Sequence, residues 1–241
     1  MRNLPRMDDV QQKDFLPALA SHLIVVAEAN AGKAPSEREL AEHFSVSRGQ
    51  VRESLAILEA MQVIERRAKS GIYLRKDQRG IEQLAFFVRA GLPLDPRQIF
   101  EAVEVRKIHE IKAAEMAAER ATEENFANLE RILESSEQRI AAGEGLAKLD
   151  HDFHLEIVRA TQNEVFYNLC TTFYVLSEKR LDVYFKESER NLQSHREHQQ
   201  IYDALCRRDP ALSMALMNSH LRGAMSYWSE LLDDKDAKPL Q

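Results

Sequence analysis

Apolar residues recur at helical spacing along most of the chain, and two short runs of this kind follow each other within residues 35–60. Leu40 and Phe44 lie one turn apart in the first run, as do Val51 and Leu55 in the second. Only the segment "SVS" separates the two runs. This pattern predicts a helix-turn-helix, in which the first helix and the turn fix the angle at which the second helix projects.

Serine residues stand at the predicted start of both helices. Ser36 with Glu39, and Ser47 with Gln50, have the spacing of a capping box, in which a serine hydroxyl binds a free N–H group of the first helical turn. The sequence "IERRAKSGIYLRK" follows, with β-forming residues on both sides of the polar turn at 69–71. This pattern predicts a short β-hairpin directly after the two helices.

The rest of the chain has a helical pattern with almost no alternation typical of strands. We predict helices at 81–90, 96–120, 122–142, 146–161, 164–187, 190–208 and 210–233. The predicted fold is mainly α: an N-terminal winged helix-turn-helix domain with a small β-hairpin, followed by an all-α antiparallel helical bundle. The predicted parts are a tail at 1–13, the winged domain at 14–76, a linker and linking helix at 77–94, the bundle at 95–233 and a tail at 234–241.

Composition and charge indicate the cellular compartment of the protein and the kind of partner that it binds. The two cysteines form no CxxC pair, no apolar stretch reaches the ~20 residues of a membrane helix, and the N-terminus lacks a signal-peptide segment. These features predict a cytoplasmic protein without a membrane partner. The net charge of −6 is uneven, because residues 1–80 hold 13 basic and 11 acidic residues while the remainder holds 20 and 28. A small basic patch on an acidic chain indicates that the N-terminal part meets a polyanion.

The second helix of the predicted pair concentrates this basic character. Its pattern turns Arg48, Gly49, Gln50 and Arg52 away from the apolar face. Arginine grips guanine edges or phosphates with two hydrogen bonds, glutamine reads adenine, and glycine allows the DNA backbone to come close. Surface arginines on an amphipathic helix are often merely solvated. Here, however, the capping residues, the short turn and the basic hairpin follow one another in the order expected of a winged helix-turn-helix. Together they predict binding to double-stranded DNA.

A second group of candidate residues lies in the helical half. Asp150 and His154 are four residues apart, so both side chains project from one helical face and could bind one cation. His198 and His220 on later helices are further candidates, and a set of one oxygen and three nitrogen ligands suits zinc, or nickel or a similar divalent ion. Spacing alone leaves open that these are structural histidines. His151 and His195 are rivals for the same role, whereas His22, His43 and His109 are interpreted as structural or surface residues.

Arg106 is the remaining polar residue expected in a pocket of the bundle. A buried arginine needs an anion, which could be a ligand or a structural partner such as Glu101 or Glu110. A metal-dependent hydrolase-like domain would need a nucleophile elbow, an HExxH motif or a paired general base, and the chain shows none of these motifs. Glu156 and Asp152 are interpreted as solvated helix residues. We therefore expect no enzyme; the remaining alternative is a non-specific architectural DNA-binding protein.

The segment "PSERELAEHFSVSRGQVRESLAILEAMQVIERR…SGIYL" closely resembles the winged-helix domain of the GntR family of bacterial transcription regulators. The helical remainder resembles the FCD effector-binding domain of the FadR subfamily, so that the resemblance covers about residues 15–230. The family usually has a "G…pG" turn before PSER, whereas "AEANAGKAPSER" is shorter here, which affects only the end of the first helix.

The resemblance implies a homodimer that binds a pseudo-palindromic operator, most simply as a repressor, and that responds to a small organic acid. It implies a divalent metal, zinc or nickel, held by Asp150, His154, His198 and His220, and it implies that Arg106 holds the carboxylate of the effector. The DNA-contacting residues that it implies are Arg38, Ser47, Arg48, Gly49, Gln50 and Arg52, with Ser70 and Gly71 in the wing.

Overall fold

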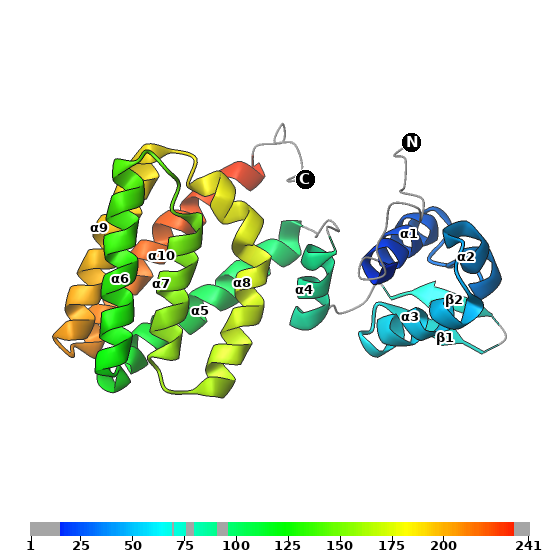
Figure 1. The fold of residues 1–241 in the computed structure, drawn as a ribbon, viewed down its shortest axis with the longest axis horizontal. Coiled ribbons are helices and arrows are strands. Elements are labelled where there is room, and N and C mark those ends of the chain that lie inside the picture. The colour runs from blue at the N-terminus through cyan, green and yellow to red at the C-terminus, as the bar shows by residue number, and fades with distance from the viewer. Residues whose placement is uncertain (1–14, 69, 76–79, 91–95, 234–241) are drawn as a thin grey trace. The chain divides into compact units, whose positions relative to one another are not determined.

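The chain divides into two compact units that meet in sequence between residues 94 and 95 (Figure 1). The computed structural model describes residues 15–68, 70–75, 80–90 and 96–233. The predicted tails at 1–13 and 234–241, Lys69 in the hairpin turn, and both ends of the predicted linker and linking helix (77–79 and 91–94) lie outside these residues. The fold class is the one that the sequence predicts: the described residues are mostly helical, with a small antiparallel hairpin after the helix-turn-helix and a helical bundle later in the sequence.

In the N-terminal unit, the described residues form four helices and a two-stranded sheet around one core. Leu19, Leu23, Leu40, Leu55 and Ile64, which come from four different elements, are all at most 1% exposed. The strands pair antiparallel, and the helix that follows them contributes the buried Phe87 to the same core. The elements are α1 (Phe15–Ala29), α2 (Glu37–Phe44), α3 (Arg48–Ala60), β1 (Ile64–Arg67), β2 (Gly71–Leu74) and α4 (Ile81–Arg89).

Helix α2 begins with the complete capping box that the sequence predicts. The Ser36 hydroxyl accepts from the Glu39 backbone N–H at 3.3 Å, and the Glu39 carboxylate accepts from the Ser36 backbone N–H at 2.8 Å. Both N–H groups belong to the open end of the helix and would otherwise have no intrahelical partner. The box therefore fixes the start of the helix that braces α3.

Replacing Ser36 by alanine is expected to lower the free energy of unfolding of the N-terminal unit by about 1 kcal/mol, because the N-cap acceptor is lost. Urea denaturation followed by circular dichroism measures this change. Ser36→Thr keeps a hydroxyl at the same position and serves as the matched control. Equal losses in both variants would contradict the assignment of the stabilisation to the cap.

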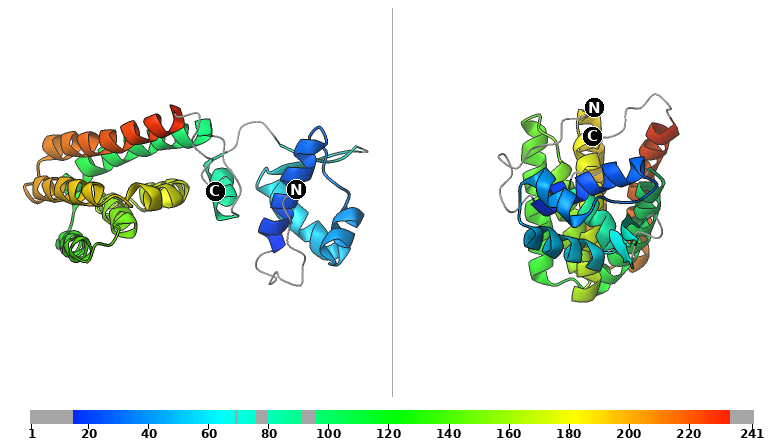
Figure 2. Two further views of the ribbon diagram at one scale, coloured as in Figure 1. Left: turned by 90° about the horizontal axis from the view of Figure 1, so that it is seen from above. Right: turned by 90° about the vertical axis from the view of Figure 1, so that its right-hand side faces the viewer.

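The C-terminal unit is a bundle of six helices arranged around α5. Helix α5 packs against α7, α8, α9 and α10, while α6 packs against α7 and α9 (Figures 1 and 2). Ala113, Ala114, Ala117 and Ala118 of α5 are completely buried, and such small side chains allow neighbouring helices to approach closely. The helices are α5 (Pro96–Arg120), α6 (Glu123–Ala141), α7 (Ala147–Arg159), α8 (Glu164–Tyr184), α9 (Ser188–Cys206) and α10 (Pro210–Asp233).

One expectation about this bundle is wrong. Glu156 is not a solvated residue but is only 7% exposed, and its carboxylate accepts hydrogen bonds from the side-chain amides of Asn125 at 2.8 Å and Asn128 at 3.0 Å. A buried carboxylate has to be hydrogen-bonded, and these amides of α6 provide the bonds and tie α6 to α7. Asp152, in contrast, is paired near the surface with Lys148 at 2.6 Å.

Candidate functional site

Helix α3 is held by one face and leaves the other exposed. Ser47 caps its start by accepting from the Gln50 backbone N–H at 3.2 Å. Val51 and Leu55 are completely buried, whereas Arg48 and Arg52 are exposed on the opposite side. The buried face fixes the direction in which the arginines project.

The two arginines of α3 differ in their surroundings. The Arg52 guanidinium donates to the Glu37 carboxylate of α2 at 3.2 Å, and the same carboxylate lies 3.9 Å from Arg66 of the hairpin. The N-terminus of α2, the middle of α3 and the hairpin therefore lie next to one another. Within the described part of the chain, Arg48 forms no ion pair, and Arg38 of α2 is an exposed residue 4.0 Å from Glu42.

The hairpin tip carries the remaining residues of the predicted DNA contact. Ser70 is exposed and its hydroxyl lies 2.7 Å from that of Tyr73. Gly71 has φ +119°, a conformation that residues with a side chain rarely adopt. A groove runs between the hairpin and the start of α2, and Lys33, Arg66 and Arg67 are among the residues that line it.

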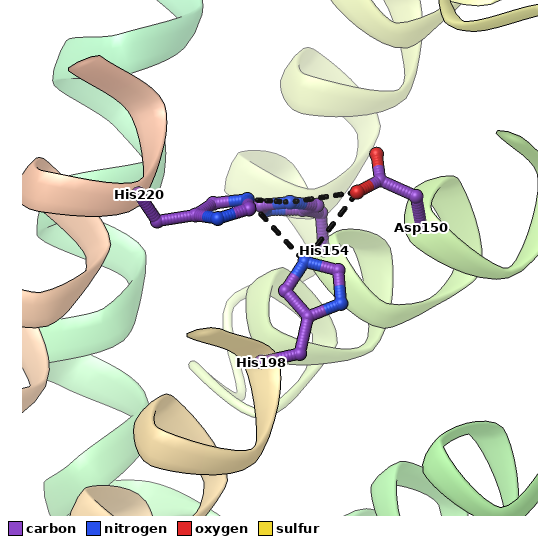
Figure 3. A group of neighbouring side chains, drawn as sticks. All are labelled: Asp150, His154, His198 and His220. Carbon is purple, nitrogen blue, oxygen red and sulfur yellow. Dashed lines mark hydrogen bonds and ion pairs between the residues drawn. The ribbon is translucent and has the colours of Figure 1, made fainter. Parts of the chain in front are cut away.

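Four side chains with metal-binding atoms converge inside the helical bundle (Figure 3). Asp150 and His154 come from α7, His198 from α9 and His220 from α10. Their ligand atoms all lie within 4.8 Å of one another, and the side chains are between 1% and 9% exposed. The structure thus brings together all four residues that the sequence singled out.

The local sequence explains why these polar groups face the interior. On α7, Asp150 and His154 alternate with Phe153 and Ile157 at the spacing of a core-facing stripe, and all four are buried. On α9, His198 shares the buried face with Ile201 in the same way. The candidate ligands therefore occupy positions that an apolar residue would otherwise fill.

Four of the distances within the cluster are near those of a tetrahedral site. The Nε2 atom of His220 lies 3.1 Å from that of His154 and 3.3 Å from that of His198, and Asp150 Oδ1 lies 3.4 Å from His198 Nε2 and 3.8 Å from His154 Nε2. Nitrogen ligands at 2.0–2.1 Å in tetrahedral geometry lie about 3.3 Å from one another. The donor set therefore fits one small divalent cation.

Burial also affects the charge of the His198 ring. Burial lowers the pKa of His198 well below its usual value, and the neighbouring His220 and His154 lower it further. A neutral imidazole retains the lone pair that a metal ion needs. The environment of His198 therefore favours the form that binds a metal.

Two carboxylates contact the Nδ1 atoms of clustered histidines, on the side of the ring away from the cluster. Neither carboxylate was predicted as part of a site. Glu110 Oε2 lies 2.6 Å from His154 Nδ1, and Glu197 Oε2 lies 2.6 Å from His220 Nδ1. Burial alone would raise the pKa of Glu110, but the charge of Arg106, with a smaller contribution from the neighbouring His154, outweighs burial and holds this pKa below its usual value. Sequence reasoning missed these contacts because each joins side chains on two different helices, and no local pattern along the chain brings them together.

Arg106 is paired with a carboxylate of its own helix. Its Nε donates to Glu110 Oε1, its guanidinium lies 4.6 Å from the centre of the Tyr174 ring, and its side chain is 12% exposed. Of the two structural partners considered, Glu110 is the one used, because Glu101 pairs with Arg97 at 2.9 Å. Arg106 thus contacts Glu110, and Glu110 contacts His154 of the cluster.

The other histidines lie outside the cluster. His151 packs against the Tyr174 ring with 4.9 Å between ring centres, and His109 packs edge-to-face against Phe166 and Phe173. His195 is buried on α9, and His22 stacks on His43 in the N-terminal unit. None of these five is in the cluster that the described residues form.

Comparison with known proteins agrees with both halves of this description. Residues 21–74 match the family model of bacterial regulatory proteins of the gntR family, and residues 101–223 match the FCD domain model. The HTH-type transcriptional regulator LutR of Bacillus subtilis is 32% identical over 194 residues, which cover 78% of this chain and 88% of LutR. The Exu regulon transcriptional regulator of Escherichia coli K12 is 29% identical over 212 residues, covering 84% and 78% of the two chains.

Solved structures show the same fold. A structure from work on Lar of Listeria monocytogenes superposes with a TM-score of 0.63 at 18% identity, over 92% of this chain and 99% of the other. No described helix has the length and apolar character required to cross a bilayer. The relatives named here are transcription regulators and not enzymes. The chain therefore belongs to the GntR family of bacterial transcription regulators, and its helical unit carries an FCD domain.

Proposed function

We propose that the chain acts as a homodimeric repressor whose affinity for its operator is controlled by a small carboxylate metabolite, bound together with a divalent metal in the FCD domain. The observation that carries this proposal is the convergence of four buried metal-binding side chains in the same chain as an exposed recognition helix. A relative named as the transcriptional repressor NanR, 28% identical over 209 residues, supports repression rather than activation.

The recognition part of the proposal rests on α3. Two protomers would each insert this helix into a major groove of a pseudo-palindromic operator. Arg48 is exposed and forms no ion pair with the described residues, so its guanidinium is available for a base edge or phosphate. A Cβ at Gly49 would approach only the Ser47 hydroxyl, at 3.8 Å, so the packing does not require a glycine. Close approach of the DNA backbone to this position would explain why the residue is a glycine. The other contacts that we propose are Arg38, Ser47, Gln50 and Arg52, with Ser70 and Gly71 in the wing.

The metal part of the proposal rests on the donor set and its spacing. Three imidazoles and one carboxylate at near-tetrahedral separations suit zinc, and nickel or a similar ion is the alternative. Asp150, His154, His198 and His220 would hold the ion. When bound, the ion would supply positive charge in the bundle interior to attract an anionic effector.

The effector part of the proposal rests on Arg106. Its contact with Glu110 uses Nε, and a guanidinium has four further N–H donors on its terminal nitrogens. A carboxylate bound by these donors would share Arg106 with Glu110, which lies against His154. The effector, through Arg106 and Glu110, and the metal, through His154, would therefore both affect the contact between Glu110 and His154. A ligand shifts such an equilibrium only through different affinities for two states, commonly by 1–3 kcal/mol.

Screening a panel of small carboxylates by thermal shift, with and without a chelator, tests this function. A matching acid is expected to raise the melting temperature of the metal-loaded chain and to weaken its operator affinity about 5- to 150-fold, because of this coupling. Arg106→Lys keeps the charge but removes the planar fork, so it should lose the response. Arg97→Lys, on an exposed part of the same helix, should retain it.

The two alternative functions predict different results. An architectural protein would bind all duplexes equally, with an affinity that follows only salt and ignores the acids. A hydrolase-like domain would consume the carboxylate instead of binding it reversibly. Either result would refute the proposed control of an operator.

A further inference from the structure

The carboxylates of Glu110 and Glu197, on different helices, both lie against clustered histidines. Glu197 is hydrogen-bonded to His220 Nδ1 at 2.6 Å, and Glu110 Oε2 lies at the same distance from His154 Nδ1 as a close ion-pair contact without hydrogen-bond geometry. The other oxygen of each carboxylate has a second partner. It accepts from Arg106 Nε in the case of Glu110, and from the Gln193 side-chain amide at 3.0 Å in the case of Glu197. Both carboxylates are therefore held from two sides.

This arrangement determines which ring nitrogen carries the proton. Glu197 accepts from His220 Nδ1, so this nitrogen carries the hydrogen, and a carboxylate oxygen 2.6 Å from His154 Nδ1 calls for a hydrogen on that nitrogen as well. With one hydrogen on each ring, the two Nε2 atoms are both acceptors, and they lie only 3.1 Å apart. Two lone pairs at this distance repel each other unless a cation lies between them.

We propose that Glu110 and Glu197 are positioning residues that hold His154 and His220 in the Nδ1–H tautomer and so present both Nε2 lone pairs to one divalent cation. This inference rests on the metal centre put forward in the proposed function. Carboxylates that bind the far nitrogen of a metal-binding histidine also make the ring a stronger ligand, and their loss typically weakens metal binding about 10- to 100-fold.

Glu197 provides the cleaner test. Its side chain is 31% exposed, whereas Glu110 is 2% exposed and its removal would leave the buried Arg106 without a counterion. In Glu197→Gln the oxygen is expected to keep accepting from Gln193, so that the amide NH₂ faces His220 Nδ1. A donor at this position favours the opposite tautomer, with the hydrogen on Nε2.

The experiment uses the full chain with Zn²⁺ alone, in competition with a chromophoric chelator. Glu197→Gln is expected to bind Zn²⁺ about 10- to 100-fold more weakly than the original chain. Glu189→Gln, an exposed glutamate on the same helix, should bind it unchanged. Long-range ¹H–¹⁵N spectra of the metal-free chain should show His220 protonated at Nδ1, and protonated at Nε2 in Glu197→Gln.

The outcomes separate this inference from the proposal on which it rests. Unchanged Zn²⁺ affinity together with an unchanged His220 tautomer in Glu197→Gln would overturn the positioning role and leave the metal centre intact. An original chain that gives up all Zn²⁺ to a weak chelator would refute the metal centre and this inference together. Glu110→Gln combined with Arg106→Met removes both charges of the buried pair, and it should show the same loss of Zn²⁺ affinity through His154.

Discussion

Arg48→Ala is expected to abolish most of the operator binding by the proposed homodimer. Each copy of Arg48 would contribute a base or phosphate contact worth about 1–3 kcal/mol, and the dimer would lose two of them. The affinity should therefore fall roughly 30-fold to 20,000-fold. Arg48 is exposed and on the face of α3 opposite the core, so the fold should be unaffected. Gel shifts on genomic fragments selected with the original chain measure the loss.

Arg97→Ala is the matched control for this experiment. Arg97 is also an exposed arginine near the start of a helix, but it belongs to α5 in the other unit and pairs with Glu101. Its removal should leave operator binding unchanged. If Arg48→Ala shifted the selected fragments like the original chain, α3 would not be the recognition helix. A proportional loss on all duplexes would instead identify Arg48 as a phosphate contact.

His154→Ala is expected to remove the stabilisation of the FCD domain by metal. An ion present at 1,000 times its dissociation constant stabilises the folded state by about 4.1 kcal/mol, which corresponds to roughly 10 °C in melting temperature for a unit of this size. His154 is one of the four proposed ligands and lies 3.1 Å from His220, so its loss should eliminate most of this shift. Differential scanning calorimetry with and without Zn²⁺ measures it, together with metal analysis of the purified variant.

His151→Ala provides the comparison on the same helix. His151 packs on the Tyr174 ring and not in the cluster, so this variant should keep the full metal-dependent shift. Operator binding by the metal-free chain should change little in either variant, because the recognition helix belongs to the other unit. Full metal occupancy in His154→Ala would overturn the proposed set of ligands.

Helices were predictable where their limits depend on neighbouring residues. The structure starts α10 at Pro210, as the sequence predicted, and the Asp209 carboxylate accepts from the backbone N–H of Leu212 at 3.0 Å. The capping box at Ser36 and Glu39 also formed. Such interactions span three residues, so their geometry follows from local spacing. The burial of Glu156 was not predictable, because its partners lie on another helix about thirty residues earlier.

The sequence by itself determined the order of the elements, the amphipathic pair that ends in an exposed arginine ridge, and the shared face of Asp150 and His154. Each of these depends on residues within one or two helical turns. Only the tertiary structure decided that His198 and His220 reach the same point, that Arg106 pairs with Glu110, and that Glu197 lies behind His220. These contacts depend on how whole helices pack, and packing is set by many buried side chains at once, so no short pattern along the chain encodes it.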